Sequence, residues 1–348
     1  MLTSPRARLA GSLAAVAALA ITGAGAGATA TPAASSTATG SVFFINPVQS
    51  SGDESLTDQK DSDAAVPAAD YRTVTLTNLD GSGRLVGDYA NVVSETGDPA
   101  IATDGKFLYT RHDDRFEQVM AYYWVTEAQK YIQGLGFTGA SGALPAVNRE
   151  SQDVRINQLG VDNSFSWDKK DLLRFGKGGV DDAEDGEVIL HEYGHAVHDA
   201  QVPGFGTSEE AGSIGEAFGD YLAVTVGLVV TGAPAGDVPA ACVMDWDATS
   251  YTSTVPHCLR RVDTNLTVAN KNGEVHHDGM IWSRALWDIR NALGARTADR
   301  IIINAQFDFA PDTSFSDAAA ATVATAQEMY GTKAANTVRK AFTDRGIS

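Results

Sequence analysis

Alternating apolar and polar residues divide the chain into a front part with strand patterns and a rear part with helical patterns. Residues 71–79 (YRTVTLTNL) alternate with a period of two, and turn-forming residues follow at 80–83. Shorter strand patterns occur at 155–160 and 172–175. Apolar residues recur at helical spacing over 116–132, 187–201, 213–230, 277–293, 298–307, 317–330 and 333–345. Strands first and helices last predict an α+β fold.

The first thirty residues have the pattern of an export signal. Arg6 and Arg8 are their only charges, residues 9–21 form an apolar run, and ATA at 28–30 fits a small-x-small cleavage site. A retained membrane anchor is the alternative, but many Ala, Gly and Thr residues make the segment weakly hydrophobic. We therefore expect residues 1–30 to be removed and the protein to be secreted, with no membrane contact after signal removal.

Composition divides the remaining chain into three segments. Residues 31–70 are rich in Ala, Ser and Thr and then in Asp and Ser, which indicates an extended, loosely packed N-terminal arm. Residues 71–200 are expected to form an α+β lobe that ends with the helix at 187–201. Residues 201–348 are expected to form a helical lobe.

The overall composition narrows the class of protein. Of the 348 residues, 43% are hydrophobic, which excludes disorder throughout and allows a large core. The chain has 26 Lys and Arg against 44 Asp and Glu, a net charge of −18 with His neutral. Such a field repels nucleic acids and anionic membrane surfaces, so neither is an expected partner.

Cysteine use agrees with export. Cys242 and Cys258 are the only cysteines, and turn-forming residues surround them. In an exported protein they predict one disulfide that closes a surface loop. Such a bridge stabilises a fold by about 3 kcal/mol in the chain-entropy description. Two unrelated thiols are the alternative.

The segment HEYGH at 191–195 predicts a metal site. His191 and His195 lie four residues apart in a predicted helix, so their rings are offset by about 40° and 6 Å and can bind one ion. Imidazole ligands at this spacing suit zinc. Glu192 projects about 100° from His191, beside the ion, where a general base for an attacking water must stand.

An acidic pair on the next predicted helix offers a third ligand. Glu216 and Asp220 lie about one turn apart among apolar residues, where buried carboxylates are costly unless they have a partner. Zinc would satisfy Glu216, and the free ring N–H of His191 or His195 would satisfy Asp220. A solvated acidic face is the alternative.

Together these motifs resemble the thermolysin-type zinc endopeptidases, most closely their fungalysin-like branch. HEYGH is followed downstream by the pattern GxxxEAxxD. Further similar segments are NSF at 163–165, CLR at 258–260, VHHDGMIW at 275–282, and the terminal helix pair from AQEMYG at 326–331 to Phe342. The resemblance covers roughly residues 71–345 and implies a two-lobed zincin with the zinc cleft between the lobes.

The resemblance also implies roles for individual residues. Glu192 would be the general base, and His276 would donate to the transition-state oxyanion, with the adjacent His277 as the alternative. Arg260 would hold a substrate carbonyl, and Asn163 would anchor the peptide backbone.

An apolar specificity pocket follows from the same resemblance. Val188 and Leu259 match positions that line this pocket in the family, which implies cleavage beside hydrophobic residues. We therefore expect protein or peptide substrates and a monomeric protein.

Two features of the family are missing from the sequence. The position of the oxyanion tyrosine falls near Thr207, and that of the Asp that orients the transition-state histidine falls at Lys271. Glu274 and Asp278 are the candidates to replace this Asp.

Calcium binding is left open. Glu187 matches a calcium ligand of the family, but Gly227 occupies the position of another. The acidic run at 181–185 contains carboxylates that suit calcium, although a solvated charged loop is the favoured interpretation.

The predicted function is that of a secreted, zinc-dependent endopeptidase. The alternative is a secreted binding or adhesion protein that keeps the zinc helix for structure and has lost turnover. A zinc aminopeptidase is disfavoured because the sequence has no Gly-x-Met-Glu-Asn segment to hold a free substrate amine.

Overall fold

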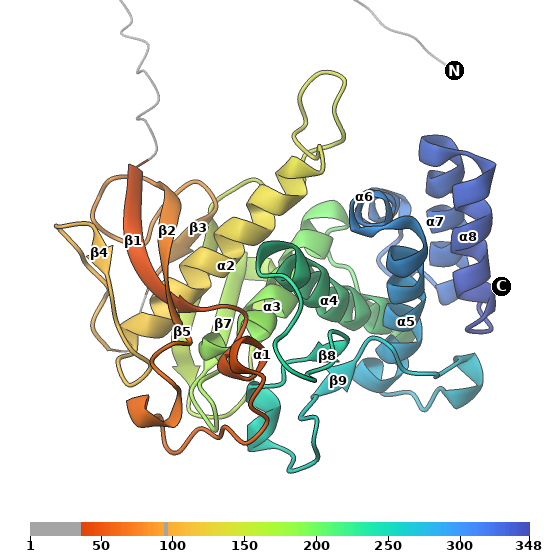
Figure 1. Ribbon diagram of the computed structural model, residues 1–348. Helices are drawn as coiled ribbons and strands as arrows, with labels where there is room; N and C mark the ends of the chain where they lie inside the picture. Colours follow the sequence, from red (N-terminus) through yellow and green to blue (C-terminus); the bar gives the residue numbers. More distant parts are fainter. Residues whose placement is uncertain (1–35, 94–96) are drawn as a thin grey trace, which may run out of the picture. The chain divides into compact units, whose positions relative to one another are not determined.

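The computed structural model describes residues 36–93 and 97–348. The predicted export signal and the first residues of the expected arm lie outside the described residues. The described chain belongs to one compact unit, in which strands come first and helices follow, as expected for an α+β fold (Figure 1).

The first sheet has three strands in the order β2-β1-β4. Strand β1 (Ser36–Phe43) pairs antiparallel with β2 (Tyr71–Leu79) and parallel with the short β4 (Lys106–Phe107). The alternating pattern predicted β2 with the bounds that the structure gives it.

The first described part of the expected N-terminal arm, residues 36–50, is not loosely packed. Its strand β1 ends at Phe43, and the short helix α1 (Pro47–Ser51) follows with Val48; both side chains are fully buried. Strand β1 consists largely of Ala, Ser, Thr and Gly and has no clear apolar pattern, so the sequence did not predict it. It is ordered because it pairs with β2.

The second sheet has the order β3-β5-β7-β6. Strands β3 (Ala90–Val92), β5 (Gln152–Leu159) and β7 (Leu172–Gly176) are parallel, and β6 (Phe165–Trp167) pairs antiparallel with β7 at the edge. Both short strands that the sequence predicts are confirmed as β5 and β7. The edge strand β6 also contacts the helix that carries HEYGH.

Three long helices form the centre of the fold. Helices α3 (Gly186–Gln201) and α4 (Glu209–Val230) pack side by side, and α2 (Arg115–Gly134) contacts both (Figure 1). Helix α4 is long and apolar enough to cross a membrane, but 78% of its most apolar stretch is buried inside the protein, as in a core helix. The predicted lobe boundary at 200–201 falls between α3 and α4 and stays a prediction.

The rear of the chain is helical, as predicted. Its helices are α5 (Val275–Leu293), α6 (Ala295–Ala305), α7 (Phe315–Tyr330) and α8 (Thr332–Thr343). Helices α5 and α7 begin slightly earlier than predicted because the capping side chains of Glu274 and Ser314 precede their first apolar residues. Short 3-10 helices occur at Asp63–Ala65, Asp168–Lys170, Asp182–Glu184, Asp247–Ser250, Val268–Asn270 and Gln306–Asp308.

A small hairpin follows α4. Its strands β8 (Cys242–Val243) and β9 (Arg260–Arg261) are antiparallel. The predicted disulfide between Cys242 and Cys258 is present and closes the loop that joins the two strands.

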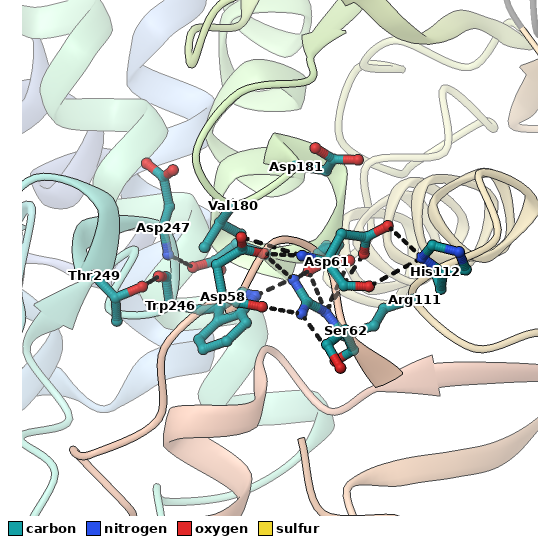
Figure 2. Close-up of polar contacts among 12 residues, drawn as sticks. Asp58, Asp61, Ser62, Arg111, His112, Val180, Asp181, Trp246, Asp247 and Thr249 are labelled. Atoms are coloured by element: carbon teal, nitrogen blue, oxygen red, sulfur yellow. Dashed lines mark hydrogen bonds and ion pairs between the residues drawn. The ribbon is translucent and has the colours of Figure 1, made fainter. Parts of the chain in front are cut away.

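The acidic run at 181–185 is buried, so the expected solvated loop is wrong. Its four carboxylate residues, Asp181, Asp182, Glu184 and Asp185, are at most 5% exposed. Arg111 Nη2 lies 2.7 Å from Glu184 Oε2, and Figure 2 shows the same guanidinium joined to Asp58 and Ser62. The fold brings Arg111 to this segment from elsewhere in the chain, and the sequence pattern gives no sign of that pairing.

Candidate metal centre

Helix α3 carries the HEYGH segment, and a side-chain cap fixes its start. Asp185 Oδ1 accepts a hydrogen bond from Glu187 N at 2.9 Å. In the helix that begins here, His191 and Glu192 are buried, and His195 is half-buried.

Two glycines allow α3 and α4 to approach closely at this point. A Cβ atom on Gly194 would lie 2.9 Å from Gly219 Cα, and one on Gly219 would lie 2.6 Å from His191 Nδ1. A larger residue at either position would separate the helices or displace the His191 ring. The two glycines thus bring Glu216, on α4, within reach of the histidines on α3.

The predicted ligand atoms converge. His191 Nε2 lies 3.2 Å from His195 Nε2 and 3.2 Å from Glu216 Oε2, and His195 Nε2 lies 3.6 Å from Glu216 Oε1. Two imidazole nitrogens and one carboxylate therefore gather around one point at the contact between α3 and α4.

This arrangement fits a zinc ion. Bonds of about 2.0–2.1 Å in a tetrahedron place neighbouring ligand atoms about 3.3–3.4 Å apart, close to the observed separations. Two Nε2 atoms that face each other need a proton or a cation between them, because their lone pairs otherwise repel. Two histidines and one glutamate are also a donor set that catalytic zinc sites use.

Asp220 contacts the first of the two histidines between which the sequence left the choice open, and its orienting role stays a prediction. Its Oδ1 atom lies 2.9 Å from His191 Nδ1. Arg260 donates to both oxygens of Asp220, from Nε and Nη2, each at 2.7 Å. Although burial opposes it, the positive charge of Arg260 lowers the pKa of Asp220 to about 2.

Glu192 lies beside the ligands and not among them. Its side chain is buried, and burial, assisted by the nearby Glu216 charge, raises its pKa to about 7. Its Oε2 atom makes no hydrogen bond within the described part of the chain. It lines the same cavity as His191 and His195.

His276 reaches the site from the first turn of α5. Its Nε2 atom lies 3.3 Å from Glu216 Oε2, and its Nδ1 atom lies 2.6 Å from Glu274 Oε1. The adjacent His277 instead contacts Asp278, at 2.9 Å. Of the two candidates, Glu274 therefore contacts the ring of His276 and Asp278 that of His277, while the role of His276 stays a prediction.

A cavity of about 320 Å³ opens at the metal centre. Nine of the predicted site residues line it: Asn163, Val188, His191, Glu192, His195, Glu216, Leu259, Arg260 and His276. Asp220 lies behind His191, and the disulfide tethers the hairpin that carries Arg260.

The cavity also contains residues that the sequence did not reveal as site residues. Asp162, Asp182 and Asp247 line it and form a second group of clustered carboxylates. No single motif contains them, because they come from one loop and two short 3-10 helices that are far apart in sequence. Asp182 does belong to the conspicuous acidic run, which was the one available signal.

Comparisons with known proteins agree with these motifs. Residues 204–347 match the sequence model of a family described as "Thermolysin metallopeptidase, alpha-helical domain". Gelatinase from Enterococcus faecalis (strain ATCC 700802 / V583) is 26% identical over 263 residues, which is 70% of this chain and 46% of the relative. The chain thus spans about half the length of that relative.

A solved structure shares the fold. It is titled "Precursor of Protealysin, Metalloproteinase from Serratia proteamaculans", with a TM-score of 0.54 and 17% identity over 75% of this chain and 88% of that one. Fold and sequence together support a thermolysin-like metallopeptidase. The finer placement near the fungalysin-like branch stays a prediction.

Proposed function

We propose that this thermolysin-like chain is a secreted zinc endopeptidase in which Glu192 is the general base. The observation that carries the proposal is the convergence of His191, His195 and Glu216 with Glu192 buried beside them. Secretion rests on the export pattern of residues 1–30 and agrees with the disulfide.

Glu192 would move the protons of the reaction. Zinc bound by the three ligands would supply the Lewis acidity that activates water and polarises the scissile carbonyl. Glu192 would take a proton from the attacking water and pass it to the leaving amine. Burial raises the pKa of the Glu192 carboxyl above its usual value, which makes it a better proton acceptor than an exposed carboxylate.

His276 and Arg260 would stabilise the substrate. The Glu274 carboxylate lies 2.6 Å from His276 Nδ1 and orients the ring, and a proton on Nε2 would donate a hydrogen bond to a developing oxyanion. Arg260 has further N–H groups besides the two that bind Asp220, and it lines the cavity, so it can donate to a substrate carbonyl. Asn163 would bind the peptide backbone.

Calcium remains part of the proposal as a structural ion. Asp185, Glu187 and Asp245 are buried near the start of α3, and Asn46 donates hydrogen bonds to Asp185 and Asp245. Burial raises the pKa of Asp185 to about 6 and those of the other two carboxyls well above their usual values. A cation such as calcium would compensate the negative charges of these three buried carboxylates.

The substitution Glu192→Gln tests the proposal. It removes the base and keeps the shape, so we expect casein hydrolysis to fall by at least about a hundredfold while zinc content and melting temperature are retained. Glu328→Gln, at an exposed position on α7, is the control and should hydrolyse casein like the wild type.

Either of two results would contradict the proposal. Undiminished hydrolysis by Glu192→Gln would exclude Glu192 as the base. A wild-type protein that binds one zinc ion and hydrolyses nothing would favour the binding or adhesion protein instead.

A further inference from the structure

Three carboxylates gather in the cavity that also holds the metal ligands. Asp162 follows β5, Asp182 begins the 3-10 helix Asp182–Glu184, and Asp247 begins the 3-10 helix Asp247–Ser250. One oxygen from each lies within 4.8 Å of the other two. All three residues line the cavity with His191, Glu192 and His195.

Each carboxylate has a buried oxygen that lacks a hydrogen bond. The Oδ1 atoms of Asp162, Asp182 and Asp247 have no hydrogen-bond partner among the described residues. Asp182 and Asp247 are only 2% and 5% exposed. The other oxygen of Asp182 is held by the hydroxyl of Ser164 and the backbone N–H of Gly176, which leaves Oδ1 free for a ligand.

The group lacks an internal cation. None of the ion pairs within the described chain includes these three residues; the nearby Arg111 binds Glu184, and Lys177 binds Asp114. Burial, followed by the charge of Asp162, raises the pKa of Asp182 to about 7, and burial with the charge of Asp182 raises that of Asp247 well above its usual value. A cation that entered the cavity would relieve this repulsion and desolvation.

The rest of the cavity wall suggests the kind of cation. Val188, Met244 and Leu259 line the same cavity and present apolar surface. An apolar wall together with an acidic group suits a long side chain that has an aliphatic stem and a cationic end.

We propose that this cavity binds an arginine or lysine side chain of the substrate beside the scissile bond, through Asp162, Asp182 and Asp247. The proposal rests on the proposed peptidase function and names its substrate class. It replaces the expected preference for hydrophobic residues, because Val188 and Leu259 then contact the stem of the side chain and not a wholly apolar residue.

A substrate side chain fits the group better than a calcium ion. Calcium takes six to eight oxygen ligands, whereas this group gathers carboxylates from three residues only. A guanidinium presents five N–H donors in one plane and can bind several carboxylate oxygens at once. The carboxylates also line the cavity at which the reaction is proposed to occur, which a substrate side chain reaches together with the scissile peptide.

Matched peptides test the charge alone. The zinc-loaded wild-type protein is first given a digest of denatured protein, and its cleavage sites are mapped by mass spectrometry. Peptides based on one such site then carry Arg, citrulline or Leu at the preferred position; citrulline has nearly the shape of Arg without its charge. We expect kcat/KM for the Arg peptide to exceed that for the citrulline peptide by at least about tenfold.

Asp247→Asn, which removes one of the three carboxylates, should reduce this ratio several-fold. Asp237→Asn, at an exposed position, is the matched control and should keep the wild-type ratio. If Asp247→Asn fails to fold, as judged by circular dichroism, the Arg-to-citrulline ratio of the wild type still tests whether the cavity selects a positively charged side chain.

The outcomes separate the two proposals. If the wild type cleaves the Leu or citrulline peptide as well as the Arg peptide, the basic-side-chain inference is wrong and the peptidase function stands. If it cleaves no peptide, the proposed function itself fails. If calcium raises the melting temperature of the wild type but not of Asp247→Asn, and charge does not affect cleavage, the group is a calcium site and the inference is overturned.

Discussion

At the scale of single residues, His198 is a titratable side chain without a polar partner. It is 1% exposed, and its ring stacks on Phe205 with centroids 3.7 Å apart, with Phe218 at its edge. Neither ring nitrogen has a hydrogen-bond partner among the described residues. Burial, with a smaller contribution from His195, lowers the pKa of His198 to about 3.

This burial predicts part of the acid sensitivity of the fold. Because the folded-state pKa lies below the unfolded value of about 6.5, the unfolded chain binds the proton first. Stability is therefore lost as pH falls below about 6.5, by about 2 kcal/mol between pH 7 and pH 5. In His198→Phe this loss of about 2 kcal/mol between pH 7 and pH 5 should disappear. Urea unfolding at the two pH values measures the free energy of unfolding of each protein.

The matched control is His112→Phe, because the His112 side chain is 76% exposed. This variant should keep the wild-type difference between pH 7 and pH 5. An equal loss of stability in His198→Phe and wild type would contradict the account of His198.

The residues of the metal centre differ in how far the sequence predicts them. His191, Glu192 and His195 follow from spacing within one helix, and Glu216 from an acidic pair in an apolar helix. These predictions agree with the geometry because helical periodicity fixes which side chains share a face. The carboxylate that orients His276 was left open between two candidates, since a choice between near neighbours depends on the local turn.

Of the group of Asp162, Asp182 and Asp247, the sequence signalled only Asp182, through the acidic run at 181–185. The members of the group are distant in sequence and lie in a loop and two short 3-10 helices, where no periodicity relates one residue to another. Their shared cavity is a product of the tertiary fold alone.

At the scale of elements, the buried pair of Arg111 and Glu184 joins the loop before α2 to the segment before α3. The guanidinium donates from Nε to both Glu184 oxygens, at 3.1 and 3.0 Å, and from Nη2 to Oε2 at 2.7 Å. Trp246 Nε1 donates to the same carboxylate at 3.1 Å. These bonds fix the segment that leads into the metal-binding helix.

Replacement of Glu184, the negatively charged partner of Arg111, should therefore lower the stability of the fold. In Glu184→Gln, a buried guanidinium loses its main counter-charge, so we expect a loss of about 3 kcal/mol in the free energy of unfolding. Denaturant unfolding at pH 7 measures it. The control is Asp263→Asn, since the pair of Asp263 with Arg261 is about one-third exposed and should be worth less than about 1 kcal/mol. Equal losses in both variants would show that burial of the pair does not matter.

Elements with a clear period were predicted well, and those without one were not. Strand β2 and the helices from α2 to α8 follow from their apolar spacing. Strand β1, with the sequence STATGSVF, has small residues and little alternation. Its order depends on β2 and β4, which begin 28 or more residues after its end, so composition alone indicated a loose arm.

At the scale of the whole molecule, the metal centre lies where three helices meet. Helix α3 gives two ligands, α4 gives the third, and α5 gives His276; α4 packs against both of the others. The hairpin closed by the disulfide adds Arg260. The proposed reaction thus draws on elements from both the front and the rear of the chain.

Zinc content, measured by elemental analysis after dialysis against a weak chelator, tests this assembly most directly. We predict one zinc ion per wild-type chain, and a content far below one in Glu216→Ala, while Glu328→Gln retains the wild-type value. Full zinc occupancy in Glu216→Ala, or none in the wild type, would contradict the account.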